Sequence, residues 1–129
     1  YGFVYKITHT PSSKSYLGKK VLIHNKKTKL TKKDLLMYEG VQGRKPTYKI
    51  QQKDSNWKSY YGSNKTLMEL VQTESLENFK REILILCTTK KLLTYYETQA
   101  LFTYRVLEKD DIWFNDNILG KFFRKDFDI

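Results

Sequence analysis

Two tyrosines, two lysines and one distant glutamate are the side chains of this sequence best suited to chemistry. Tyr5 and Tyr16 lie in two short apolar runs, and Lys19 and Lys20 follow the second run. A tyrosine has an ordinary pKa of about 10, and nearby cations favour its phenolate or a strong hydrogen bond to water. Glu97 stands on an apolar strip of a predicted helix, where a carboxylate is costly unless it is paired, metal-bound or at a cleft edge. The two tyrosines and two lysines therefore predict a polar site, and Glu97 is a candidate to supply its carboxylate.

A β-hairpin at the start of the chain positions the tyrosines. Large apolar residues alternate in the first run, which places Phe3, Tyr5 and Ile7 on one face of a strand. Residues 8–14 hold a proline and two serines and are typical of a loop. Residues 15–20 are rich in strand formers, so we expect them to return antiparallel to the first strand.

The two runs also resemble a known signature. Gly2-Phe3-Val4-Tyr5 is followed by Tyr16-Leu17-Gly18. This pair resembles the motif of the GIY-YIG nuclease family, in which a Gly-x-Tyr strand precedes a Tyr-x-Gly strand. The first element is one residue longer than that pattern. Later segments follow the family's order of a helix, a third strand, a helix with a glutamate and then an asparagine, whereas a long basic insertion after Lys20 departs from it.

The resemblance implies a fold and an activity. The expected fold is α/β (α+β), with a small central antiparallel β-sheet flanked by helices. The expected activity is divalent-metal-dependent DNA endonuclease, with double-stranded DNA as partner and Mg²⁺ or Mn²⁺ as cofactor. A divalent cation with one carboxylate compensates charge on phosphoryl oxygens and stabilises a leaving group. One protein carboxylate suits an ion that keeps several waters, as magnesium does.

The resemblance also assigns site residues. Glu97 lies where the family's metal-binding glutamate falls, and Lys19 matches a lysine directly after the Tyr-x-Gly element. Asn115 is the preferred asparagine, and Asn117 is the alternative. Which tyrosine is the base stays open. The family carries an arginine on its first helix; no arginine stands at the usual short distance after Gly18, so the candidates are Arg44 in the insertion and, as a substitute cation, Lys58.

Length and charge agree with a nucleic-acid partner. The chain has 129 residues and a net charge of +10, which suits one domain spanning 1–129 with a basic insertion at about 24–58. Such an excess of positive charge favours polyanionic partners. The lysines expected to contact nucleic acid are Lys20, Lys26, Lys27, Lys45, Lys58 and Lys65. The lone Cys87, the absence of a long apolar run and the absence of a secretory signal pattern predict a cytoplasmic protein without a membrane span.

Further elements are predicted along the chain. We expect residues 21–23 to extend the second strand, residues 31–38 to form a short helix, and residues 65–73 to form a helix capped by Ser63 or Asn64. The apolar run 82–87 favours a central strand covered on both faces. A long helix is expected over 90–108, with a core-facing stripe of Leu92, Tyr96, Ala100, Tyr104 and Leu107. His9 and His24 are expected at the surface.

Three functional hypotheses remain. The general pattern resembles phage-encoded or mobile-element enzymes of the homing type. A restriction-type endonuclease of the same fold is the second hypothesis, and a non-catalytic nucleic-acid-binding module is the third. The sequence contains no Gly-rich phosphate loop, no His-Glu-x-x-His and no nucleophile elbow that would favour another catalytic class.

Overall fold

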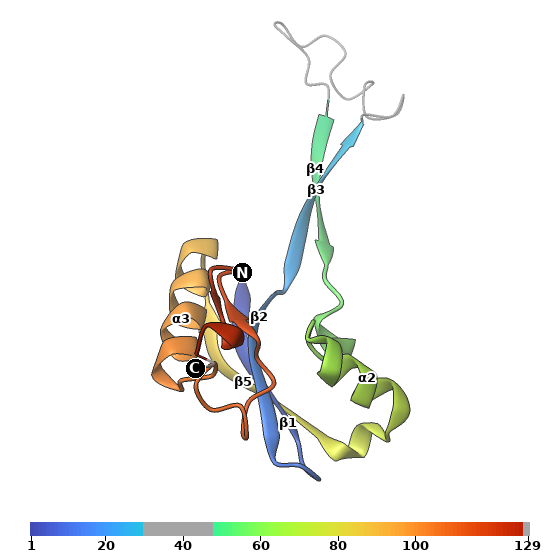
Figure 1. Cartoon of the computed structure of the whole chain (residues 1–129). Helices are drawn as coiled ribbons and strands as arrows, with labels where there is room; N and C mark the ends of the chain where they lie inside the picture. Colours follow the sequence, from blue (N-terminus) through green and yellow to red (C-terminus); the bar gives the residue numbers. More distant parts are fainter. Residues whose placement is uncertain (30–47, 128–129) are drawn as a thin grey trace, which may run out of the picture. The chain divides into compact units, whose positions relative to one another are not determined.

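A computed structural model describes residues 1–29 and 48–127 of the chain, and side-chain burial for residues 1–23 and 53–127. The chain divides into two compact units. One comprises Tyr1–Leu22 and Asn56–Ile129, and the other comprises Ile23–Ser55. The larger unit contains the sheet and helices shown in the lower part of Figure 1.

The larger unit is built on a three-stranded antiparallel sheet. Strand β1 (Gly2–His9) lies between β2 (Lys14–Val21) and β5 (Phe79–Cys87). Helices cover this sheet, so the predicted fold class is confirmed (Figure 1). The predicted hairpin is also present, with Phe3, Tyr5 and Ile7 buried on one face of β1. The second strand ends at Val21 rather than continuing through residue 23.

The prediction that residues 82–87 form a central strand covered on both faces was wrong. Strand β5 lies at an edge of the sheet, and Ile83, Leu84 and Leu86 are 53%, 39% and 71% exposed. The pairing of β1 with β5 shifts between Val4 and Tyr5, which leaves Leu84 without a partner residue. A continuous apolar run does not by itself distinguish a central strand from an edge strand.

One face of the sheet is covered by α2 (Lys65–Thr73) and by the short 3₁₀ helix η1 (Trp57–Ser59). The predicted bounds of α2 are confirmed, and Asn64 is its N-cap, with its side chain accepting a hydrogen bond from the Leu67 amide at 3.0 Å. Leu67 is fully buried against the sheet. This face is rich in aromatic rings: Phe3, Tyr5, Phe79 and Phe114 are buried in it, and Tyr16, Trp57, Tyr60 and Tyr61 pack against them.

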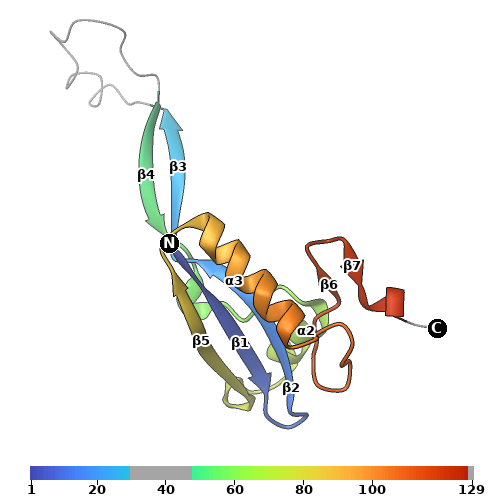
Figure 2. The same ribbon diagram turned by 90° about the vertical axis from the view of Figure 1, so that its left-hand side faces the viewer.

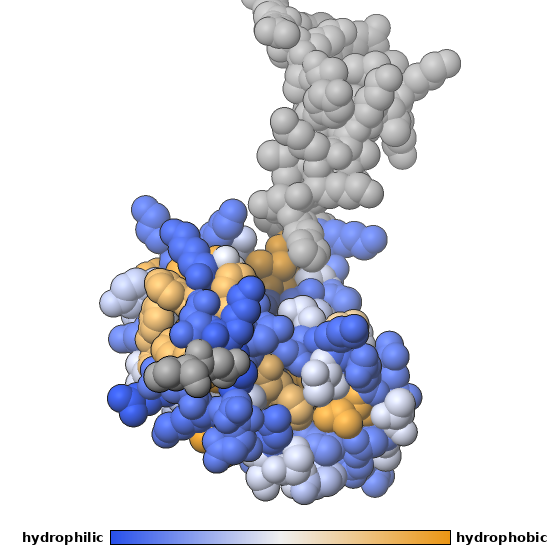
Figure 3. Space-filling model, viewed as in Figure 1, coloured by the Kyte–Doolittle hydropathy of each residue, from blue (hydrophilic) through white to orange (hydrophobic). Residues whose placement is uncertain are grey.

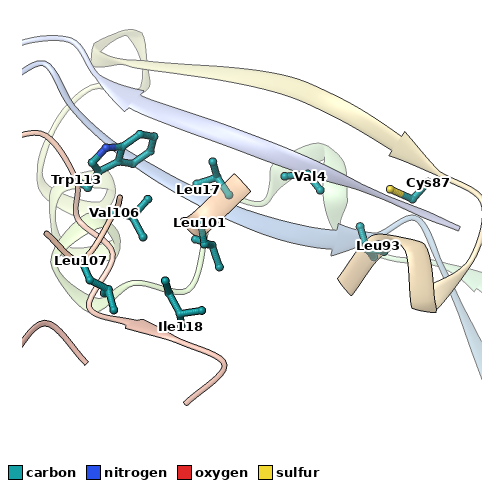
Figure 4. Packing of buried hydrophobic residues seen from close by; sticks show 9 residues of the cluster. All are labelled: Val4, Leu17, Cys87, Leu93, Leu101, Val106, Leu107, Trp113 and Ile118. Carbon is teal, nitrogen blue, oxygen red and sulfur yellow. The ribbon is translucent and has the colours of Figure 1, made fainter. Parts of the chain in front are cut away.

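Helix α3 (Lys90–Thr103) covers the other face (Figure 2), and Thr89 is its N-cap, with its side chain accepting from the Leu92 amide. Figure 4 shows the mainly aliphatic cluster between this helix and the sheet, which includes Leu93 and Leu101 and also Trp113. The predicted core stripe was partly wrong, because Leu92 and Tyr104 are 41% and 50% exposed. The buried positions Leu93 and Leu101 flank Glu97 at intervals of four residues, so Glu97 lies on the core-facing side of the helix.

Helix α3 ends at Thr103, earlier than the predicted residue 108, and Arg105 has a φ of 54°. A left-handed residue cannot continue an α-helix.

After α3 the chain forms the short strands β6 (Asn117–Ile118) and β7 (Phe122–Phe123) and the 3₁₀ helix η3 (Arg124–Phe127). Another 3₁₀ helix, η2 (Leu76–Asn78), precedes β5. Apolar side chains remain exposed over α3 among hydrophilic ones (Figure 3). Leu92 and Phe102 of this helix are 41% and 51% exposed.

The expectation that His9 lies at the surface was wrong. His9 is 6% exposed, and its Nε2 lies 2.9 Å from a Glu74 carboxylate oxygen. Its Nδ1 lies 2.7 Å from the Ser12 hydroxyl. The hydrogen bond between His9 and Glu74 is the main cause of the lowered pKa of the Glu74 carboxyl. His9 therefore joins the first hairpin to the end of α2.

The smaller unit contains an antiparallel pair of strands, β3 (Ile23–Lys29) and β4 (Tyr48–Asp54). This pair was not predicted, although it forms both ends of the basic insertion. Lys26 and Lys27 belong to β3. The predicted helix 31–38, Arg44 and Lys45 lie outside the described residues. Among the described residues, no helix has the length and apolar character needed to cross a membrane.

Candidate active site

The strand register places both motif tyrosines on one face of the hairpin. Tyr5 pairs with Gly18, and Ile7 pairs with Tyr16, so the two tyrosine rings lie with centroids 6.2 Å apart. No bulge interrupts the β1–β2 pairing between Gly2 and Tyr5. The extra residue of the first motif element therefore does not displace Tyr5 from the face that Tyr16 occupies.

Gly18 provides the space for Tyr5. A Cβ at this position would lie 2.6 Å from the Tyr5 hydroxyl oxygen and 3.1 Å from the Tyr16 ring. Such distances are too short for any side chain larger than hydrogen. The glycine of the Tyr-x-Gly element thus lets the Tyr5 hydroxyl lie directly against the backbone of β2.

The Tyr5 hydroxyl is buried. Tyr5 is 5% exposed, its ring meets that of Tyr60 edge to face at 6.0 Å, and the two side chains are hydrogen-bonded. Burial raises the pKa of Tyr5 far above its ordinary value, and the neighbouring Tyr16 raises it further. Tyr5 is therefore a neutral phenol, suited to hold neighbouring groups in place.

The Tyr16 hydroxyl is more accessible. Tyr16 is partly buried, its ring lies over Gly62, and its hydroxyl is 3.3 Å from the Ser63 hydroxyl. Gly62 has a φ of 91°, which favours glycine at this point of the loop. Burial raises the pKa of Tyr16, whereas the hydrogen bond from Ser63 opposes this rise. Ser63 was considered from the sequence only as a helix cap, and its contact with Tyr16 was missed.

The first of two effects expected of Lys19 and Lys20, that they favour the tyrosine phenolates, finds no support in the pKa shifts; the second, a strong hydrogen bond to water, stays a prediction. The Lys20 ammonium lies over the Tyr60 ring at 4.0 Å from its centroid, and the Lys19 ammonium donates to the Thr94 hydroxyl at 3.1 Å. Neither lysine is among the causes of the pKa shifts of Tyr5 and Tyr16, which are raised. Alternation along β2 places Lys20 on the tyrosine face and Lys19 on the opposite face.

Glu97 reaches the outer edge of β2 from α3. Its carboxylate accepts a hydrogen bond from the backbone amide of Lys19, one residue beyond Gly18. Burial is the largest influence on this carboxyl and raises its pKa, while the Lys19 ammonium acts in the opposite direction. A half-buried carboxylate therefore lies at the strand edge where the tyrosine-bearing face and the α3 face of the sheet meet.

Asn115 secures the same strand edge. Its side-chain oxygen accepts from the Leu17 amide at 3.0 Å, and its side-chain nitrogen donates to the Leu17 carbonyl at 2.8 Å. Ser15 is held on this edge by backbone bonds to Ile112 and Phe114. Asn115, which is 3% exposed, thus replaces a partner strand between Tyr16 and Gly18. Asn117 instead accepts from the Gly120 amide in a turn, at 3.1 Å.

Two arginines whose contacts were not predicted, Arg81 and Arg124, hold this framework together. The Arg124 guanidinium donates to the carbonyls of Val106, Trp113 and Asn115. Arg81 donates to the carbonyls of Lys58 and Tyr60, at 2.8 and 3.3 Å. Neither arginine stands in a motif, and their partners are 9 to 23 residues away in the chain, so local patterns gave no signal for them.

The remaining predicted cations lie in different places. Lys58 is exposed, and its ammonium lies 5.6 Å from the centroid of the Trp57 ring. Lys65 is exposed at the first position of α2. The side chains of Lys26 and Lys27 belong to the smaller unit and are not described. The structure therefore brings Tyr5, Tyr16, Lys19, Glu97 and Asn115 together around β2.

The residues around Glu97 fit a divalent cation that keeps most of its water. No group of three or more His, Cys, Asp and Glu residues suited to a metal ion occurs in the described part of the chain. Glu97 would thus supply one carboxylate. Magnesium is commonly bound by one or two carboxylates, with waters and substrate phosphate as its other ligands. Burial disfavours the charged form of Glu97, and a cation at its free oxygen would compensate that charge.

Two tyrosine phenols, a half-buried carboxylate and two lysines thus lie around one strand of a small α/β sheet. Residues 1–118 match the family model described as "Putative endonuclease segE, GIY-YIG domain". The chain belongs to this family of GIY-YIG endonuclease domains, so it is a nuclease, a phosphodiester hydrolase acting on DNA. No curated protein and no solved structure matches the chain.

Proposed function

We propose that this protein cleaves double-stranded DNA with a divalent cation, magnesium or manganese, held by Glu97. The observation that carries the proposal is the position of the Glu97 carboxylate, which is half-buried and bonded to the Lys19 amide at the edge of β2. The adjacent Tyr-x-Gly element presents Tyr16 from the same strand. A phosphate at this edge would meet both groups.

In this proposal Tyr16 contacts the attacking water. It is the more accessible of the two tyrosines, and the Ser63 hydroxyl is placed to stabilise its deprotonated form. Water attacks phosphorus and gives its proton to the deprotonated Tyr16, while the bond between phosphorus and the leaving oxygen breaks. The leaving oxygen takes a proton from solvent water, and Tyr16 later returns its proton to solvent. Tyr5 stays protonated and positions Tyr60 and Tyr16. When bound, the cation neutralises charge on the phosphoryl oxygens.

Lys19 and Asn115 act differently in this scheme. The Lys19 amide orients the Glu97 carboxylate, and its ammonium, held by Thr94, lies close enough to influence Glu97. Asn115 is a positioning residue, because both ends of its amide bond the Leu17 backbone. Arg44, Lys45, Lys26 and Lys27 are proposed to contact DNA from the basic insertion.

The biological setting proposed is that of a phage or mobile-element enzyme of the homing type, acting in the cytoplasm of a host cell. The matching family model supports the endonuclease activity on which this setting depends. A restriction-type enzyme of the same fold is the second candidate. The two differ in whether they cut one long site or many short sites.

The test is incubation of supercoiled plasmid and of phage DNA with the protein, with magnesium, manganese or chelator. Nicked or linear product in either metal, and none with chelator, is the expected result. A few discrete phage-DNA fragments support the homing-type enzyme, and many support the restriction type. If the wild type cleaves DNA and Glu97→Ala binds DNA without cleaving it, the protein is a nuclease and not a DNA-binding module. If the wild type binds both DNAs and cleaves neither, the proposal is overturned.

A further inference from the structure

A cavity of about 520 Å³ opens beside the candidate active site, over β1 and β5. This volume falls in the range of about 300–1,000 Å³ that is typical of small-molecule sites. Tyr5 and Tyr60 line the cavity, and both also belong to the tyrosine network described above. Glu97 lies at the outer edge of β2, across β1 from this cavity.

The cavity has aromatic walls. Phe3 and Trp57 meet edge to face at 6.1 Å, and Tyr61 and Phe79 do so at 6.2 Å. These rings line the cavity together with Tyr5, Tyr60, Ile7 and Ile83. Aromatic side chains are the groups on which nucleobases stack, without regard to sequence.

Two cations line the same cavity. The Lys58 ammonium lies over the Trp57 ring, and the Arg81 guanidinium lies over the Tyr61 ring at 4.4 Å from its centroid. Arg81 uses one nitrogen for the Lys58 and Tyr60 carbonyls, and a guanidinium has five donor hydrogens in all. Donors therefore remain for a phosphate that lies beside the aromatic walls.

Glu82 also lines the cavity, but strand alternation directs its side chain elsewhere. It pairs with Lys6, whose ammonium lies 5.9 Å from the Trp113 ring in the other face of the sheet. The lining thus combines aromatic surface and positive charge, which together match a nucleotide and not a purely apolar ligand.

We propose that this cavity binds one nucleotide of the DNA substrate, with its base among the aromatic walls and its phosphate at Lys58 and Arg81. The inference rests on the proposed function, because the nucleotide belongs to the strand that is cut. A base in a duplex must leave its stack to enter such a cavity. The cavity therefore favours a substrate whose base is unpaired or easily unstacked.

Tryptophan fluorescence tests the proposal without cleavage. The chain has two tryptophans; Trp57 lines the cavity, and Trp113 is buried in the cluster beneath α3. The variant Trp113→Phe is titrated, with chelator present, with a short oligothymidylate and with an abasic oligomer of equal length and charge. The complementary variant Trp57→Phe shows whether any change arises from Trp113.

The expected result is saturable quenching of Trp57 by oligothymidylate, and binding at least about tenfold weaker for the abasic oligomer. Lys58→Met weakens oligothymidylate binding several-fold, whereas Lys80→Met, an equal charge change on the opposite face of β5, does not. No change in Trp57 emission, an equal response to both oligomers, or an equal effect of both lysine variants overturns the proposal.

Cleavage measured separately distinguishes this proposal from the proposed function. Metal-dependent cleavage without a Trp57 response to the base would support the proposed nuclease function and overturn the proposed nucleotide binding in the cavity. A base-dependent Trp57 response without cleavage of plasmid or phage DNA would support nucleotide binding in the cavity and overturn the proposed nuclease function.

Discussion

The two faces of the sheet differ in chemistry, and they meet at the outer edge of β2. The face under α2 buries aromatic rings and holds the phenols of Tyr5 and Tyr16. The face under α3 buries aliphatic groups and holds the Glu97 carboxylate. The tyrosine phenols are thus kept apart from the Glu97 carboxylate by the thickness of one strand. A phosphate at that edge could reach both sets without either set neutralising the other.

The tyrosine face is tested most strongly by removing each hydroxyl. We expect Tyr16→Phe to lower the cleavage rate by about 10²–10³-fold and to leave stability nearly unchanged, because its hydroxyl has one exposed partner, Ser63. Tyr5→Phe should lower the rate less and the free energy of unfolding more, by about 1 kcal/mol, because its hydroxyl is buried. Single-turnover cleavage and urea unfolding measure both. The opposite ranking of rates would assign the contact with water to Tyr5.

The close approach of Tyr5 to β2 is tested by Gly18→Ala. The new Cβ would displace the Tyr5 hydroxyl, so we expect about 10²-fold slower cleavage and a loss of about 1–3 kcal/mol of stability. Gly120→Asn is the control, since a Cβ there meets nothing within 4 Å and asparagine tolerates the φ of 63° better than other side chains do. Cleavage unaffected by Gly18→Ala would show that the position of Tyr5 does not matter.

The shared edge itself is tested by Asn115→Ala. This variant leaves the buried Leu17 amide and carbonyl without partners, so the free energy of unfolding should fall by about 2–3 kcal/mol. Asn117→Ala removes a bond in an exposed turn and should cost about 0.5 kcal/mol. Denaturant unfolding compares the two variants. Equal losses would contradict the role of Asn115 as the partner of β2.

These residues also show what the sequence could and could not predict. The hairpin and α2 follow from local alternation and capping patterns and were predicted, and Asn64 was one of two predicted caps of α2. The edge position of β5, the burial of His9 and the contacts of Arg81 and Arg124 depend on partners far along the chain. The β3–β4 pair was missed because its lysine-rich strands lack the apolar alternation that identifies a strand.

The α3 face gives the smallest expected effect, on stability. The folded pKa of Glu97 is raised above its ordinary value of 4.5, so the folded state binds a proton more tightly than the unfolded state. This contribution lowers the free energy of unfolding as pH rises from 4.5 through the raised pKa. Glu97→Gln should therefore match the wild type below pH 4.5 and be slightly more stable at neutral pH. Thermal unfolding across this range measures the difference, and a less stable Glu97→Gln at neutral pH would contradict the pKa shift.

The most direct test of the central claim compares Glu97→Gln with Glu69→Gln, a matched change at an exposed position of α2. Cleavage and DNA binding are measured in the same samples, with magnesium present. The account predicts that Glu97→Gln binds DNA as the wild type does and cleaves at least about 100-fold more slowly, whereas Glu69→Gln cleaves normally. Cleavage by Glu97→Gln at the wild-type rate would contradict the assignment of the metal-binding carboxylate to the edge of β2.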